Sequence, residues 1–261
     1  MTQEERQQII NLVKQEVIPA IGCTEPIAVA LCVAKATEVL GCRPEKINVF
    51  LSANILKNAM GVGIPGTGMI GLPIAVALGA LIGKSSYQLE VLKDSTPQAV
   101  EEGKAYLNEK RISIALKDDC TEKLYVEVVC EAGSSHSCAI ISGEHTRFVF
   151  VSKDADVLLK EDVVADASAQ EKTLNLTLHK VYDFALTAPL AEIAFILDTA
   201  KLNKAAAESS FKGNYGHSLG RMLKGDSEKR MMGNGTLSRI LSYTSGACDA
   251  RMAGAMIPVM S

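Results

Sequence analysis

Tryptophan is absent from this sequence, and aromatic residues make up only 5% of it. An excess of positive charge is also lacking, because 27 lysines and arginines stand against 30 aspartates and glutamates, for a net charge of −3. The core must therefore rest on aliphatic side chains and methionine, and 48% apolar residues supply enough of them for a globular protein. Nucleic acid is not an expected partner, since its recognition needs clustered positive charge.

Signals for export and for membrane insertion are missing as well. The N-terminus, MTQEERQQIINLVKQ, is polar and acidic where a signal peptide would be basic and then apolar. The longest uncharged stretch, residues 58–83, contains Pro65, Pro73 and five glycines between positions 61 and 71, which would break a spanning helix. We therefore expect a cytoplasmic protein without a membrane segment, whose cysteines stay reduced.

The cysteines lack the spacing of a local metal site. There are 7 of them, at positions 23, 32, 42, 120, 130, 138 and 248, and no two form a C-x-x-C pair. This spacing excludes a zinc ribbon and a ferredoxin-type run. Any metal cluster would have to collect its ligands from distant parts of the chain.

What is present is a clear change of hydrophobic periodicity along the chain. A capping box at Thr2 and Glu5 opens a first helix, and helical spacing recurs over residues 24–40, 74–82 and 97–108. Residues 46–51 alternate as a strand does.

Alternation dominates the middle of the chain. Four successive segments between residues 111 and 153 have a period close to two and are separated by turn residues, which predicts an antiparallel β-meander. After residue 154 helical spacing returns, most clearly over 190–211. The sequence therefore predicts an α+β fold with three regions: a helix-rich region over residues 1–110, the meander over 111–153 and a helical region over 154–261.

Cys23 stands where the second helix should begin, in the segment GCTEP. Thr24 is a good N-cap, Glu25 suits the positive end of a helix, and Pro26 is tolerated in a first turn. A thiol at this position faces unsatisfied backbone N–H groups, which favour the thiolate, the form that attacks electrophiles and binds metals. Site chemistry is therefore favoured over buried filler, and the residue is either a nucleophile or a metal ligand.

The glycine-rich segment VGIPGTGMIGLP is a second candidate site. Its consecutive N–H groups, with the helix that follows, would cradle a carboxylate or phosphate. A tight turn that allows close backbone packing explains the same composition equally well. The residues of the cradle are Gly66, Thr67 and Gly68.

Polar residues elsewhere are weaker candidates. Asn54, Lys57 and Asn58 fall at the predicted end of a strand just before the glycines, where a solvated turn is the usual explanation for a lysine.

His145 lies at a predicted hairpin turn, where a histidine is more often exposed than catalytic. Asp249 and Arg251 lie among small residues, which would let a ligand approach, although a structural ion pair is the ordinary alternative.

Several segments occur in order along the chain: GCTEPIAVAL, LSANILKNAMGVGIPGTGMIGLPIAVALGALIG, LEVLKD, GEHT, FILDTAKLN and DARMAGAMIPVMS. Together they resemble the bacterial and archaeal family of L-cysteine desulfidases, which is related to the α component of iron–sulfur-dependent L-serine dehydratase. The similarity covers essentially the whole chain, and the block 51–83 is its most specific segment.

The resemblance implies a lyase without pyridoxal phosphate that converts L-cysteine to pyruvate, ammonia and sulfide. A [4Fe–4S] cluster held by three cysteines leaves one iron open as a Lewis acid, while a base removes the α-proton. In this chain the resemblance makes Cys23 a cluster ligand, His145 the candidate for proton transfer and Lys57 a second catalytic candidate. The residues it places at the substrate are Asn54, Asn58, Gly66, Thr67, Gly68, Asp249 and Arg251.

The family's pattern also includes features that this chain lacks. Its members are longer, and they carry the remaining cluster cysteines beyond the equivalent of PVMS, whereas none of the other six cysteines here matches those positions. We therefore expect a helical region that is incomplete at its C-terminus and a chain inactive alone. Such a chain is either a truncated piece of the complete enzyme or half of a split enzyme whose second chain supplies the missing half. Exposed apolar surface would also favour a homo-oligomer.

Three alternatives to the desulfidase stay open. L-cysteine and L-serine differ only in the leaving group, so a deaminase of the serine dehydratase type fits equally well. A metal-free enzyme would use Cys23 as nucleophile and His145 as base. A non-catalytic remnant would bind an amino acid without turnover.

Overall fold

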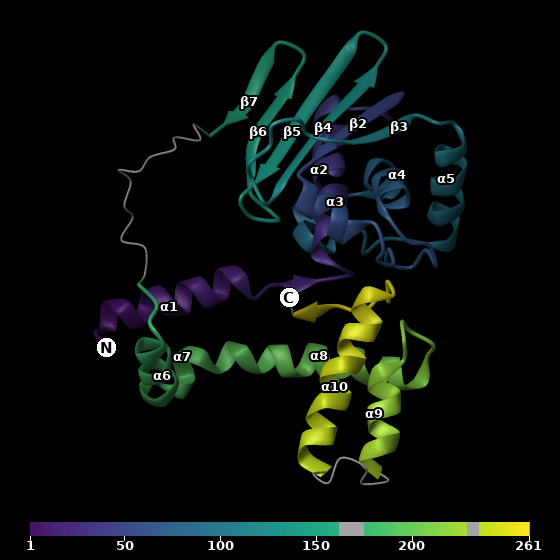
Figure 1. Ribbon diagram of the computed structural model, residues 1–261. Coiled ribbons are helices and arrows are strands. Elements are labelled where there is room, and N and C mark those ends of the chain that lie inside the picture. Colours follow the sequence, from purple (N-terminus) through teal and green to yellow (C-terminus); the bar gives the residue numbers. More distant parts are fainter. Residues whose placement is uncertain (162–174, 229–234, 261) are drawn as a thin grey trace.

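The computed structural model describes residues 1–161, 175–228 and 235–260 (Figure 1). The helices of these residues are α1 Gln3–Glu16, α2 Thr24–Leu40, α3 Ala53–Ala59, α4 Leu72–Ile82, α5 Pro97–Asn108, α6 Leu178–Thr187, α7 Leu190–Ile193, α8 Leu197–Lys212, α9 Leu219–Glu228 and α10 Gly235–Met252, with 3-10 turns at Ser85–Glu90 and Ala194–Ile196. The strands are β1 Pro19–Ala20, β2 Lys46–Leu51, β3 Ile112–Leu116, β4 Tyr125–Ala132, β5 Ser135–Ser142, β6 Phe148–Lys153, β7 Asp156–Lys160 and β8 Val259–Met260.

The predicted α+β class is confirmed, with helices on both sides of the strands along the sequence. The main sheet has the order β3-β2-β4-β5-β6-β7. Two details of the predicted meander are wrong. β3 pairs in parallel with β2 instead of lying beside β4, because the 60-residue connection between them is long enough for a crossover that carries α4 and α5. The chain also forms β7 after residue 154, where helix was expected.

The core lies between one face of this sheet and the helices α2 and α4. Alternate residues of β2 and β4, such as Val49 and Val128, are paired and point toward α2, which is buried along nearly its whole length. α2 and α4 approach closely where Gly79 faces the backbone of Ala30, since an added Cβ would lie 2.7 Å from the Ala30 carbonyl oxygen. Only an apolar helix flanked by small residues can be enclosed in this way.

The helical C-terminal region packs quite differently. α10 lies against α8 and α9 (Figure 1), but the fully buried apolar residues there are small. They are Ala206, Ala207, Ala250, Ala255 and Val259. The larger side chains of α6 to α10, including Leu178, Leu190 and Leu197, are mostly exposed.

The segment 190–211, predicted as one helix, is broken by the 3-10 turn between α7 and α8. Contacts with α1 explain the break: Glu192 pairs with Arg6 at 3.0 Å, and Lys14 lies 5.3 Å above the Phe195 ring. Tertiary contacts override local helix propensity here.

The C-terminal segment returns to the N-terminal region and closes the fold. β8 pairs with β1, and the N–H groups of Gly63 and Gly66 donate to the carbonyls of Met252 and Gly254 at 2.8 and 3.0 Å. This contact brings the end of α10 beside the start of α2. Among the described residues, no helix combines the length and apolarity that a membrane span requires.

Candidate functional site

Cys23 occupies the N-cap of α2, one residue before Thr24, which the sequence predicted as the cap, and only 8% of Cys23 is exposed. Its thiol donates a hydrogen bond to Glu25 Oε2 at 3.1 Å. The Glu25 carboxylate also accepts from Thr24 Oγ1 at 3.3 Å and from Asn58 Nδ2 at 3.2 Å. Glu25 is therefore the hub that joins the start of α2 to α3, a role that its place in GCTEP does not reveal.

The protonation of Cys23 differs from the prediction. Burial, followed by the hydrogen bond to Glu25 and its negative charge, raises the pKa of the Cys23 thiol to about 11. The expected effect of the helix N-terminus is thus outweighed, and the thiol holds its proton at neutral pH. Burial opposes ionisation of Glu25 itself, but the hydrogen bonds from Cys23 and Asn58 leave the pKa of this carboxyl lowered.

Two further groups come from distant segments. Arg251, near the end of α10, donates through Nε to the Gly22 carbonyl at 3.4 Å, and its positive charge opposes the effect of Glu25 on Cys23. His145, in the turn between β5 and β6, is half-buried. Burial lowers the pKa of His145, although the nearby Glu25 carboxylate counteracts this to a lesser extent, so the imidazole is neutral at pH 7.

A cleft of about 370 Å³ adjoins these residues, between the end of α1 and the β5–β6 turn. Thr24, His145 and Thr146 line it, together with Glu16 from α1. A hydrogen bond of 3.0 Å from Gln15 Nε2 to Glu144 Oε1 joins the two sides of the cleft. The sequence predicted His145 for this site but not the contribution of α1, because residues 15 and 16 precede the site with no local motif.

Most of the N–H groups in the predicted cradle of the glycine segment form hydrogen bonds within the chain. The N–H group of Gly66 donates to Gly254, and that of Thr67 donates to the Ile64 carbonyl at 3.2 Å. The Thr67 hydroxyl donates to Ile64 as well, at 2.8 Å, and accepts from the Met69 N–H. These bonds favour close backbone packing, one of the two interpretations of this segment, and anion binding by Gly66, Thr67 and Gly68 stays a prediction.

The other predicted polar residues separate into two groups. Asn54, Lys57 and Asn58 lie on α3 and not at the end of a strand, because the chain turns into a helix directly after Ser52. Asn58 alone reaches Glu25, whereas Asn54 and Lys57 are exposed. Asp249 is buried, and its Oδ2 accepts from the Gly220 N–H at 2.9 Å, so it holds the start of α9.

The fit of the site to an iron–sulfur cluster is limited to one thiol. Among residues 1–161, 175–228 and 235–260, no group of three or more cysteine, histidine, aspartate or glutamate side chains is placed to hold a metal ion. Cys32 and Cys130 are buried in the core, and Cys248 is exposed on α10. A [4Fe–4S] cluster is held by thiolates. The described residues therefore do not complete a cluster site around Cys23.

Comparison with known proteins places the chain among longer relatives. It is 72% identical over all 261 of its residues to a protein of Bacteroides fragilis, of which it covers 61%. It is 69% identical to a protein of Bacteroides thetaiotaomicron over the same length and share, and 40% identical over 255 residues to one of Aeromonas hydrophila, of which it covers 58%. These relatives are UPF0597 proteins.

The chain thus spans about three fifths of the UPF0597 proteins that it matches. No family model and no solved structure matches the chain. The name UPF0597 specifies no reaction, so the resemblance to L-cysteine desulfidases stays a prediction.

Proposed function

We propose that this chain is the portion that carries Cys23 in an iron–sulfur-dependent lyase of the cysteine desulfidase type, which acts on L-cysteine or on L-serine. One observation carries the proposal: four separate segments bring Cys23 and Glu25, Asn58, Arg251 and His145 together beside a cleft. A cavity of about 370 Å³ has room for a small amino acid.

A cluster would need ligands beyond those described. Cys23 offers one thiol, and it would have to release its proton to bind a metal. All 7 cysteines of this chain lie among the described residues, so the remaining thiolates would come from a second chain or from the part of the relatives' polypeptide that this chain does not span. This requirement accords with the greater length of the UPF0597 relatives, since the chain spans only 61% of the Bacteroides fragilis protein.

The described side chains suit two tasks in a β-elimination. The Arg251 guanidinium attracts the carboxylate of an amino acid, because it places a positive charge near the cleft. The neutral His145 imidazole accepts the α-proton, since burial keeps its pKa low. Loss of that proton and of the β-sulfide yields aminoacrylate, which water hydrolyses to pyruvate and ammonia. Each product of the proposed reaction is thereby accounted for.

A direct nucleophilic role for Cys23 has less support. A thiol whose pKa is raised to about 11 contains little thiolate at neutral pH, and the thiolate is the attacking form. Iodoacetamide should therefore modify the exposed Cys42 quickly and Cys23 slowly at pH 7.5, measured by peptide mass spectrometry. Rapid, stoichiometric modification of Cys23 would contradict this order and support the nucleophile.

The proposal is tested by anaerobic reconstitution with iron and sulfide. The chain is prepared alone and together with the remainder of the Bacteroides fragilis relative, and iron content and pyruvate release from L-cysteine are measured. We expect turnover only in the combined sample, its loss in Cys23→Ser, and its retention in the exposed control Cys42→Ser. Turnover without iron would refute the proposal, and so would full activity of Cys23→Ser.

A further inference from the structure

One face of α10 lines two adjoining clefts, and Arg251 is the one residue of this lining that the proposed function uses. The first has a volume of about 380 Å³ and lies between α8 and α10, and the second, of about 350 Å³, continues along α10. Tyr243 lines both, so the two clefts adjoin at this side chain, and we call the pair the α8–α10 groove. Its α10 residues recur every three to four positions from Thr236 to Arg251, as one helix face requires.

The groove has the length of a helix. α10 contains 18 residues and is therefore about 27 Å long, and the lining spans nearly all of it. Small residues, Ala200 on α8 and Ala247 on α10, lie between the two helices, which lets another backbone approach closely. Ile240, which lines the second cleft, remains 58% exposed. An apolar surface of this shape suits a packed helix better than a compact small molecule.

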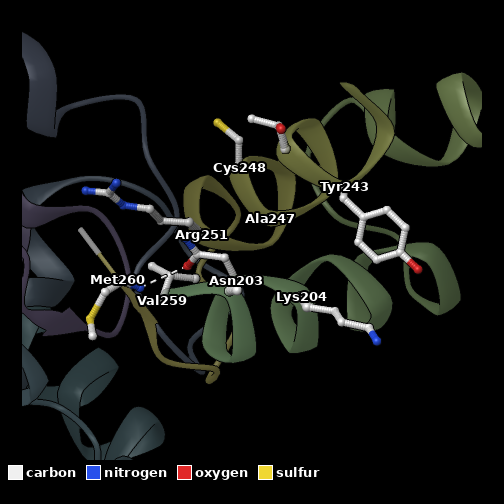
Figure 2. A pocket seen from close by; sticks show the side chains of 10 residues that line it. Asn203, Lys204, Tyr243, Ala247, Cys248, Arg251, Val259 and Met260 are labelled. Carbon is white, nitrogen blue, oxygen red and sulfur yellow. Dashed lines mark hydrogen bonds between the residues drawn. The ribbon is translucent and has the colours of Figure 1, made fainter. Parts of the chain in front are cut away.

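Charge indicates what kind of helix would fit. Lys204, Arg239 and Arg251 line the groove, and among the residues that the structure describes no aspartate or glutamate does. Lys204 has a neighbour of opposite charge in Glu208, at 3.8 Å, but that contact lies within α8. Lys204 and Arg251 extend in opposite directions (Figure 2), so they do not converge on a single anion.

The packing of the C-terminal region supplies a second reason to expect a covering element. Its buried apolar residues are four alanines and a valine, while Leu197, at the start of α8, is 65% exposed. A helical layer that buries only small residues gains little hydrophobic stabilisation by itself. The UPF0597 relatives contain further polypeptide, since 261 aligned residues are 61% of the Bacteroides fragilis protein.

We propose that the α8–α10 groove binds an amphipathic helix with acidic residues on its flanks, supplied by the portion of the UPF0597 polypeptide that this chain does not span. The apolar stripe of that helix covers Ala247 and Ile240, and its carboxylates face Lys204 and Arg239. The inference concerns assembly and goes beyond the proposed function, because it holds whether or not the protein binds a cluster.

The experiment compares two charge reversals on α8 during co-expression with the remainder of the Bacteroides fragilis relative. Lys204→Glu changes the groove, and Lys201→Glu is the matched control, because each lysine pairs with one acidic residue of the same helix. We expect a 1:1 complex by native mass spectrometry that Lys204→Glu weakens at least about tenfold and Lys201→Glu preserves. Circular dichroism of each isolated variant checks that the fold is retained.

Alkylation gives an independent readout. Cys248 lines the groove and is exposed in this chain. Cys42, just after α2, is also exposed but does not line the groove, so it serves as the control thiol. Binding of the helix should slow modification of Cys248 at least about tenfold and leave Cys42 unchanged. The proposal is overturned by the absence of a complex, by a complex that leaves Cys248 reactive or tolerates Lys204→Glu, or by a homodimer of the chain that protects Cys248 in its place.

Discussion

The contact between the glycine segment and the end of α10 can be tested by one added methyl group. In Gly63→Ala the new Cβ would lie 2.5 Å from the Ala253 carbonyl oxygen, 2.8 Å from the Gly254 nitrogen and closer still to the Ala253 carbonyl carbon. Ordinary contacts between such atoms are about 3.5 Å or longer. All three neighbours are backbone atoms, so no side chain can rotate away, and the two segments must separate by roughly 1 Å.

The expected cost follows from the bonds that this separation strains. Overpacking of a filled site costs about 1–3 kcal/mol. The N–H bonds from Gly63 and Gly66 to Met252 and Gly254 contribute about 1 kcal/mol each. We therefore expect Gly63→Ala to lower the free energy of unfolding by about 2–4 kcal/mol. Gly61→Ala is the matched control: no atom lies within 4 Å of its added Cβ, so stability should stay equal or rise by up to about 1 kcal/mol.

Urea denaturation of both variants measures these changes, and hydrogen exchange locates them. In Gly63→Ala the amides of residues 63 and 66 should lose protection, because they bond to the displaced segment. The same displacement would move Arg251 away from the Gly22 carbonyl, and the candidate site would lose its contribution from α10. If Gly63→Ala is as stable as Gly61→Ala and keeps both amides protected, the backbone contact between residue 63 and the end of α10 is wrong.

Two further predictions concern the helix packing and the cleft. Gly79→Ala should lower the free energy of unfolding, measured in urea, by about 1–2 kcal/mol, because its Cβ would lie 2.7 Å from the Ala30 carbonyl oxygen. Gly225→Ala is the control within a helix, and because no atom lies within 4 Å of its added Cβ, it should raise the free energy of unfolding by up to about 1 kcal/mol. Equal effects of the two substitutions would contradict the close approach of α2 and α4. Burial lowers the pKa of His145 below 6.5 in the folded chain, so the unfolded chain binds more protons below that pH. Stability should be full above pH 6.5 and decrease as the pH falls below it, and thermal melts of His145→Asn should show a weaker decrease than those of the exposed-site control His136→Asn.

Local signals in the sequence determined much of the secondary structure. The capping box at Thr2, the helix over residues 24–40 and the helix over 97–108 are present with the expected bounds, because caps, prolines and apolar spacing act within a few residues. The same signals placed the start of α2 to within one residue, since the N-cap is Cys23 where Thr24 was predicted.

Tertiary structure alone decided what these elements do together. Nothing within β2 or β3 specifies their parallel pairing, and the break before α8 depends on contacts with α1. The protonation of Cys23 was predicted wrongly for the same reason: its pKa is raised by burial and by the Glu25 carboxylate, and burial is a property of the whole fold. Sequence spacing determines which groups are neighbours along a helix or strand. Desolvation and charge depend on which distant segments pack around them.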